Sequence, residues 1–383
     1  MCPTGRRTGD GQRRKDRATD FTFTEEQQAA AETARTVFAD VAPDAVPSPA
    51  LTPTAVADDF DRRLWQRLAA TDLLCLVLRE SARVLARVPL LETTAVTHVL
   101  GHHAPAATAA ALLPEAATGR LVLTAAAHGA TGHEPAERSV TARPDDDHWI
   151  LDGTTDHVPW AHQADLTAVP AHTADGRTVL ALLPRDHAGL TLDAQYGTHG
   201  ERLARLRLDG VRLPADRVLD AADAWPSLRA LLTTGTCALA LGLGLGLGLG
   251  EKVLAMTSQY TGKREQFGHP VATFQAVAVQ AADRYIDLRA MEATLWQAAW
   301  RVTTAAEAAL PVEADLAVAK IWAAEGDRRV VQTAQHLHGG FGADTAYPLH
   351  RYHAWAKYLE LSLGPAAAHE ETLGDLIAAH PLD

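Results

Sequence analysis

Hydrophobic and polar positions change their spacing twice along the chain. Apolar residues recur with a helical period in the first third, over 29–39, 57–77 and 92–118, and again from residue 221 to the end. Between them, short runs rich in Val, Leu and Thr alternate with turn signals; these are 120–127, 139–144, 148–159, 165–172, 177–184, 189–194 and 201–213. Strands of this length and spacing predict an antiparallel barrel or sandwich of about 100 residues.

This order of elements predicts an α+β protein with an N-terminal helical domain over 21–118, a β domain over 119–220 and a C-terminal four-helix bundle over 221–383. Thr24 is placed to cap the first helix, and the Glu and Gln residues after it supply a capping-box partner. In the bundle, one helix is expected to run towards Gln266, with Gly268 just beyond its end.

The later bundle helices show equally clear patterns. Phe274, Ala278, Ala281, Tyr285, Leu288 and Leu295 are spaced to form one apolar helix face. A third helix is expected over 312–338, ending at Gly339-Gly340, and a fourth after Pro348, with a break at Gly364-Pro365.

One apolar stretch, 230–250, carries no charge, but six of its residues are glycine and three are threonine. The glycines dilute the insertion energy of the leucines, so a buried core segment is expected rather than a membrane span. Part of this stretch is the repeat LGLGLGLGLG at 241–250. Glycine at alternate positions permits close approach of a neighbouring backbone or flat ligand, whereas a repeat expansion tolerated in a core is the simpler interpretation.

Composition narrows the class of protein. The chain has 383 residues, of which 47% are hydrophobic and 21% charged, with a net charge of −12. This is ordinary globular composition, and the acidity disfavours nucleic acid or an anionic membrane as partner. Three cysteines without a Cys-x-x-Cys pair indicate a reducing cytoplasm, with Cys75 and Cys237 as core residues. The basic segment 1–20 lacks a signal-peptide apolar region and is expected to be a disordered tail, with a polyanion-binding arm as the alternative.

Two motifs in the C-terminal half carry a family resemblance. Tyr260–Val277 reads YTGKREQFGHPVATFQAV and resembles the Arg-x-x-Phe-Gly…Phe-Gln signature of the acyl-CoA dehydrogenases. The segment 335–342, QHLHGGFG, with YPLHR at 347–351, resembles the glycine turn before the last bundle helix of that family. The Leu151-Asp-Gly…Ala164-Asp165 pattern matches its β domain.

The resemblance implies FAD as cofactor, contacted across a subunit interface by Arg264, Phe267 and Gln275. Gln335, His336, Gly339 and Gly340 would complete the cofactor-binding set. The chemistry agrees, because a pyrophosphate needs a fixed cation and close backbone approach. Taken singly, Arg264 is a helix C-terminal cation, Phe267 a packing residue, Gln275 a solvated helix start and the glycines a helix stop.

The residues expected to remove the substrate's α-proton are missing from both places where the family puts them. Leu363 stands where many members have glutamate, and the stretch matching the alternative position, about 236–243, holds no carboxylate. Pro159 replaces a flavin-facing Thr or Ser, and Leu73–Pro89 is shorter than the acyl-pocket loop of the family. The catalytic base is therefore unknown; Glu360, Glu251, Glu370 and Glu371 are more typical of solvated helix faces. Paired histidines at 336/338 and 350/353 have no clear third ligand, so no metal is expected.

The C-terminal segment is most similar to actinobacterial members that work as pairs of unlike subunits. The resemblance therefore implies an FAD-dependent α,β-desaturase subunit in an α2β2 complex, in which a second dehydrogenase-like subunit carries the glutamate. The substrate would be a bulky acyl-CoA or acyl-carrier thioester. Two alternatives stay open: an oxygen-using flavoenzyme that needs no α-proton base, and a non-catalytic scaffold of the same fold.

Overall fold

A computed structural model of the chain describes residues 23–49, 51–52, 54–68, 74–128, 139–247 and 256–381. The predicted basic tail and Glu251 lie outside these residues. The described N-terminal part is helical, with α2 (Glu25–Phe38), the short 3₁₀ turn η1 (Pro43–Ala45), α3 (Arg62–Leu68), α4 (Leu74–Arg83), α5 (Leu90–His103) and α6 (Ala106–Ala117). Thr24 caps α2 through a capping box with Gln27, as predicted.

The prediction of helix over 57–77 is wrong at both ends. The segment 57–61 is not helical, and α4 continues six residues beyond Val77 to Arg83. Leu85, two residues after the end of this helix, takes a positive φ. The segment read as a shortened loop thus contains helix. Its apolar spacing was hard to recognise because α4 is buried along most of its length.

The sheet follows the predicted strands closely. Its members are β1 (Leu123–Ala125), β2 (Val140–Asp145), β3 (His148–Pro159), β4 (Leu166–His172), β5 (Thr178–Pro184), β6 (Leu190–Tyr196), β7 (Arg202–Pro214) and β8 (Val218–Leu219), the last after the 3₁₀ turn η2 (Ala215–Arg217). The order is β6-β7-β3-β2-β4-β5-β8, with β1 beside β4. Neighbours are antiparallel except β1·β4 and β2·β4, so the sheet is mixed.

Two central strands are apolar on both faces because both faces of the sheet are covered. In β5, Leu180 and Leu182 pack into the large core shared with the helices. The alternate residues Val179, Ala181 and Leu183 belong to a second core on the other face. A continuous hydrophobic run is what a strand buried on both sides requires.

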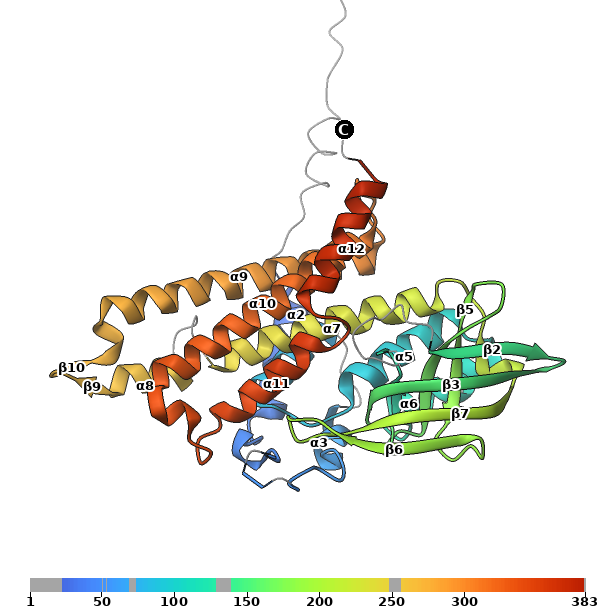
Figure 1. Cartoon of the computed structure of the whole chain (residues 1–383), viewed down its shortest axis with the longest axis horizontal. Helices are drawn as coiled ribbons and strands as arrows, with labels where there is room; N and C mark the ends of the chain where they lie inside the picture. The colour runs from blue at the N-terminus through green and yellow to red at the C-terminus, as the bar shows by residue number, and fades with distance from the viewer. Residues whose placement is uncertain are drawn as a thin grey trace, which may run out of the picture.

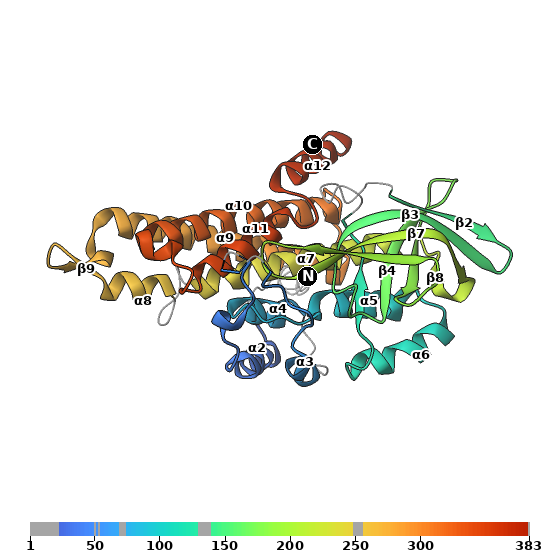
Figure 2. The same cartoon turned by 60° about the horizontal axis from the view of Figure 1, so that its bottom comes forward.

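The C-terminal half contains α7 (Ala224–Leu247), α8 (Met256–Lys263), α9 (Gln275–Thr304), α10 (Val312–His338), α11 (Leu349–Leu361) and α12 (Ala366–Ala379), with the 3₁₀ turns η3 (Val271–Thr273) and η4 (Gly339–Ala343). The stops predicted at Gly339 and Gly364-Pro365 are confirmed. The long helices run side by side away from the sheet (Figures 1 and 2). At the end of the bundle that is distant from the sheet, a short β-hairpin follows α8.

That hairpin replaces the helix end expected at Gln266. Strands β9 (Glu265–Gln266) and β10 (His269–Pro270) pair through Phe267 and Gly268, whose φ angles are +54° and +81°. Two successive positive φ values define the tight turn that matches strand twist, so Gly268 serves a hairpin rather than a helix C-terminus. Tyr285, expected on a buried face, is 44% exposed, whereas Leu288 and Leu295 are buried.

Helix α7 is the one described helix long and apolar enough to cross a membrane, and 78% of its most apolar window is buried inside the protein. Its glycines meet neighbouring helices directly. A Cβ on Gly242 would lie 2.1 Å from the Arg79 carbonyl oxygen, and one on Gly246 would lie 2.6 Å from that of Arg83. The close-approach interpretation of the repeat therefore holds at these positions, whereas the origin of the repeat as an expansion stays a prediction.

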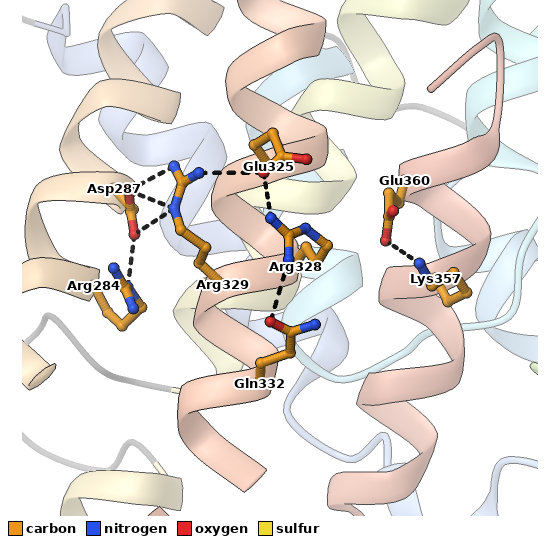
Figure 3. Close-up of polar contacts among 8 residues, drawn as sticks. All are labelled: Arg284, Asp287, Glu325, Arg328, Arg329, Gln332, Lys357 and Glu360. Carbon is orange, nitrogen blue, oxygen red and sulfur yellow. Dashed lines mark hydrogen bonds and ion pairs between the residues drawn. The ribbon is translucent and has the colours of Figure 1, made fainter. Parts of the chain in front are cut away.

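Ion pairs connect helices α9 and α10 of the bundle. Asp287 of α9 is buried and accepts hydrogen bonds from Arg284, at 2.6 Å, and from Arg329 of α10, at 2.8 Å. Glu325 pairs with Arg328 and Arg329 on α10 (Figure 3). Because Asp287 is 6% exposed, its charge depends on both arginines.

Substituting Gly242→Ala is expected to reduce the free energy of unfolding by about 2 kcal/mol or more, because the added methyl overlaps the α4 backbone. Gly374→Ala, on the exposed side of α12 where a Cβ meets nothing within 4 Å, is the matched control and should stabilise by about 0.5–1 kcal/mol. Urea denaturation of both variants measures the difference. Equal effects at the two glycines would contradict the close-contact interpretation.

Asp287→Asn should destabilise the bundle by about 2–4 kcal/mol, since it leaves two arginines around an uncharged amide. Lys357→Met is the control: its pair with Glu360 is exposed, so less than about 1 kcal/mol is expected. Thermal and chemical unfolding give both values, and a loss at Lys357 as large as at Asp287 would show that burial of Asp287 is not what matters.

Candidate functional site

An open cleft lies where α8 meets the glycine turn after α10. We call it the glycine-turn cleft; its volume is about 490 Å³, and its lining includes Tyr260, Arg264, His336, Gly339, Gly340 and Phe341. Four of the seven predicted cofactor-binding residues are thus brought together. Gly339 has φ +60° and ψ −140°, a region open essentially to glycine alone, so the turn depends on it.

Aromatic stacking holds this cleft in shape. The Tyr260 ring stacks on the imidazole of His338 at 4.4 Å between centroids, and its hydroxyl donates to the His338 carbonyl at 3.2 Å. The Phe341 ring also stacks on the Tyr260 ring, with 5.6 Å between the two centroids. Helix α8 is therefore fixed to the glycine turn, and Arg264, at the end of α8, is positioned beside exposed backbone of Gly339 and Gly340.

The other three predicted residues lie around the cleft rather than in its lining. Phe267 is at the hairpin tip and is 92% exposed. Gln275 is the exposed first residue of α9, and Gln335 is a partly buried residue of α10, one turn before Gly339. Their contact with FAD stays a prediction.

What this cleft can do chemically is bind an anion with room for a flat group. Arg264 supplies an exposed cation, and the glycine backbone is open to close approach. The one carboxylate in the lining, Asp344, accepts a hydrogen bond from the backbone N–H of Ala346 at 2.9 Å, which turns it towards its own loop.

A second cavity lies between the sheet and the helices, and we call it the junction cavity. Its volume is about 80 Å³. Leu363, Pro159 and Thr236 all line it, so the three family positions that the sequence leaves without reactive groups converge in one place. Pro159 has no N–H, and its carbonyl oxygen already accepts the Thr124 hydroxyl at 2.6 Å.

The loop that carries Leu363 is held by a buried lysine. The Lys320 ammonium, fully buried, donates to the carbonyl oxygens of Leu359, Glu360 and Gly364 at 3.0–3.3 Å. Burial lowers the pKa of Lys320 to about 8. Leu363 itself takes a left-handed φ of +59°, which is costly for a leucine and is imposed by these bonds and by His369, whose Nε2 lies 2.9 Å from the Leu363 carbonyl.

Bulky side chains fill the space around the junction cavity. His199 stacks on Tyr358 at 4.1 Å and meets Trp355 edge-on, and Trp160 follows Pro159 in the wall. Burial lowers the pKa of His199 to about 3 and that of His128 to about 4, so both imidazoles are neutral at physiological pH.

Two carboxylates in this wall were missed from the sequence. Glu201 is paired with Arg87, whose Nη2 lies 3.0 Å away, although burial raises the Glu201 pKa. Burial also raises the pKa of Glu92 to about 7 against the opposing effect of its own backbone and of the Trp160 side chain. Glu92 follows Leu90 and Leu91 in the first turn of α5. These two leucines are the one sequence signal that indicated a buried position for Glu92.

The carboxylates considered from the sequence lie elsewhere. Glu360 pairs with Lys357 at 2.6 Å (Figure 3), and Glu370 and Glu371 are exposed on α12. Within the described residues, no group of three or more His, Cys, Asp or Glu side chains is arranged to hold a metal ion. Cys237 is buried as predicted, whereas Cys75 is only partly buried.

The raised pKa of Glu92 predicts a pH-dependent stability difference. A carboxyl with a higher pKa in the folded chain stabilises the fold fully below its ordinary pKa of about 4.5, and this contribution is lost as the pH rises through about 7. Glu92→Gln should therefore match the wild type at pH 4 and exceed it by about 1–3 kcal/mol at pH 8. Urea unfolding at both pH values, with the exposed Glu371→Gln as control, measures this; a pH-independent difference would contradict it.

The comparisons with known proteins agree with this architecture. Residues 239–378 match the model for the C-terminal domain of acyl-CoA dehydrogenases. Over 346 residues the chain is 34% identical to the acyl-CoA dehydrogenase FadE27 of Mycobacterium tuberculosis, which covers 84% of this chain and 90% of FadE27.

Two solved structures are similar over almost the whole chain. One is a chain of the ChsE4-ChsE5 complex from Mycobacterium tuberculosis, with a TM-score of 0.84, 31% identity and coverage of 95% of this chain and all of that one. The other is a chain of the Tcur3481-Tcur3483 steroid ACAD, with a TM-score of 0.83, 34% identity and coverage of 93% and 98%. The fold, the signature around Arg264 and a relative of this identity and coverage together establish that the chain belongs to the acyl-CoA dehydrogenase family.

Proposed function

We propose that this chain is the subunit of an unlike-subunit acyl-CoA dehydrogenase that completes the FAD site of its partner, and that the partner holds the flavin ring and the catalytic glutamate. The observation that carries the proposal is the disagreement between the two sites on this one chain. The glycine-turn cleft fits a cofactor phosphate, and the junction cavity does not fit a flavin ring.

The misfit of the junction cavity is one of size and chemistry. Pockets for ligands of drug size measure roughly 300–1,000 Å³, whereas this cavity measures about 80 Å³. Its wall offers Pro159 and Leu363 at the positions where a hydroxyl and a carboxylate are expected. No step of desaturation is therefore assigned to this cavity.

The glycine-turn cleft is lined by residues of α8 and of the turn after α10. Helix α8 lies at the hairpin end of the bundle, away from the sheet (Figure 1). Members of the family bind FAD. Arg264 would hold the pyrophosphate of an FAD whose ring lies in another subunit, and the amides around Gly339 and Gly340 would approach it closely. When bound, the flavin accepts the hydride that leaves the β-carbon of an acyl thioester.

The exposed hairpin supports a neighbouring subunit at this place. Phe267 presents nearly its whole side chain, and Val279 and Ile286, two turns apart on α9, are also exposed. Exposed large apolar groups clustered at one end of a bundle are typical of an interface. The similar chains belong to complexes of two differently named proteins, which supports an unlike partner. By analogy with the steroid ACAD, we propose a bulky acyl thioester as substrate. From the three cysteines without a Cys-x-x-Cys pair, we propose the cytoplasm as location.

The test is co-expression with a second acyl-CoA dehydrogenase-like chain from a neighbouring gene. The complex should bind FAD and desaturate an acyl-CoA, and this chain alone should retain little FAD. In the complex, Arg264→Met should weaken FAD binding about 10–100-fold, as expected for loss of one charged hydrogen-bond donor.

Arg63→Met, on the exposed side of α3, is the control and should leave FAD affinity unchanged. Spectroscopic titration of the apo-complex with FAD gives the dissociation constants. Stoichiometric FAD in this chain alone would overturn the proposal and favour a flavoenzyme with its own reaction. If the chain binds neither FAD nor a partner, the proposal is also overturned, and a non-catalytic scaffold of the same fold is the interpretation that remains.

A further inference from the structure

A hollow of about 600 Å³ lies away from both sites, where several helices meet. Its walls are the N-terminal part of α7, the C-terminal end of α9, the first two turns of α10, one face of α12 and His98 of α5. We call it the helix-end cleft. Its lining includes Trp225, Arg229, Arg301, Glu313, Leu316 and His369.

Arg301 contributes a buried hydrogen-bond donor that the protein does not use. The side chain is 6% exposed, one terminal nitrogen pairs with Asp315 at 2.8 Å, and the other donates to the Leu310 carbonyl at 3.0 Å. Its Nε has no hydrogen-bond partner. That nitrogen is itself buried, so Arg301 forms part of the fixed wall of the cleft and does not contact a ligand directly.

Two other features of the cleft favour an anion as its ligand. Arg229 is partly buried and, among the described residues, makes no hydrogen bond or ion pair within 4 Å, and burial lowers its pKa. Helix α10, 27 residues long, begins in the cleft after Pro311, which supplies no side-chain cap. The first N–H groups of a long helix carry partial positive charge and are unsatisfied without a cap.

The charge balance limits the anion to a single negative charge. Glu313 also lines the cleft and interacts electrostatically with Arg229, so a dianionic phosphate would meet a nearby carboxylate. The remaining wall is apolar, with Trp225, Leu316 and Leu376. A pocket of this size with an apolar wall and few convergent polar groups is the usual form of a small-molecule site.

We propose that the helix-end cleft binds a hydrophobic carboxylic acid, with its carboxylate on Arg229 and the first N–H groups of α10 and its hydrocarbon against Trp225 and Leu316. The site is separate from the proposed FAD half-site and does not rest on the proposed function. It shares His369 with the loop of Leu363, because His369 lines the cleft and its Nε2 lies against the Leu363 carbonyl.

Binding of octanoate and of octan-1-ol to the purified full chain tests this, by calorimetry and by the fluorescence of Trp225. The wild type should bind octanoate at least 10-fold more tightly than the alcohol. Arg229→Gln should weaken octanoate about 10–100-fold and leave octan-1-ol unchanged. The exposed Arg63→Gln should change neither.

A second variant fills the cleft from a loop, so that folding of the helices is not at risk. Ala306→Trp, just after α9, should abolish binding of both compounds while circular dichroism stays that of the wild type. The proposal is overturned if octanoate does not bind, if it binds no better than the alcohol, or if Arg229→Gln binds octanoate as the wild type does. None of these measurements needs FAD or a partner, so their failure is distinct from failure of the proposed pairing.

Discussion

The structure depends on the burial of α7 on all sides. This helix packs on α4 and α5, on α9, α10 and α11 of the bundle, and on strand β5 of the sheet. Such contact is possible because Gly242 and Gly246 let the α4 backbone come within the distance of a missing Cβ. Each glycine costs roughly 1 kcal/mol of helix propensity relative to alanine, and the tertiary contacts must offset that cost. Residues of α7 line both the junction cavity and the helix-end cleft, so these two sites are positioned relative to one helix.

Much of the fold could be predicted from the sequence because the local signals and the tertiary structure agree. The seven predicted β runs correspond to strands, since their alternation or continuous apolarity reflects the faces that each strand buries. The breaks at Gly339 and Gly364-Pro365 were visible because glycine and proline impose backbone geometry on their own. The hairpin at Phe267-Gly268 was missed because its strands are two residues long, too short for any period to appear.

The candidate site was only half visible, for a physical reason. Arg264, Gly339 and Gly340 lie within contiguous motifs, so sequence alone could place them together. Glu92, Glu201, Arg229 and Arg301 come from unrelated segments and are ordinary residues by local pattern. Their significance comes from burial and from which partners they lack, and both are properties of the assembled core. For the same reason the glycine repeat gave no decisive signal until α4 was beside it.

The loop at Leu363 shows how packing can impose an unfavourable backbone geometry independently of the side chain. A leucine at φ +59° is unfavourable in isolation, so the surrounding bonds must impose it. Lys320 donates to three carbonyl oxygens around this turn, and His369 lies against a fourth. Those contacts involve backbone atoms and do not depend on which side chain stands at 363. Packing of the loop between α11 and α12 therefore suffices to maintain the conformation, whichever side chain stands at 363.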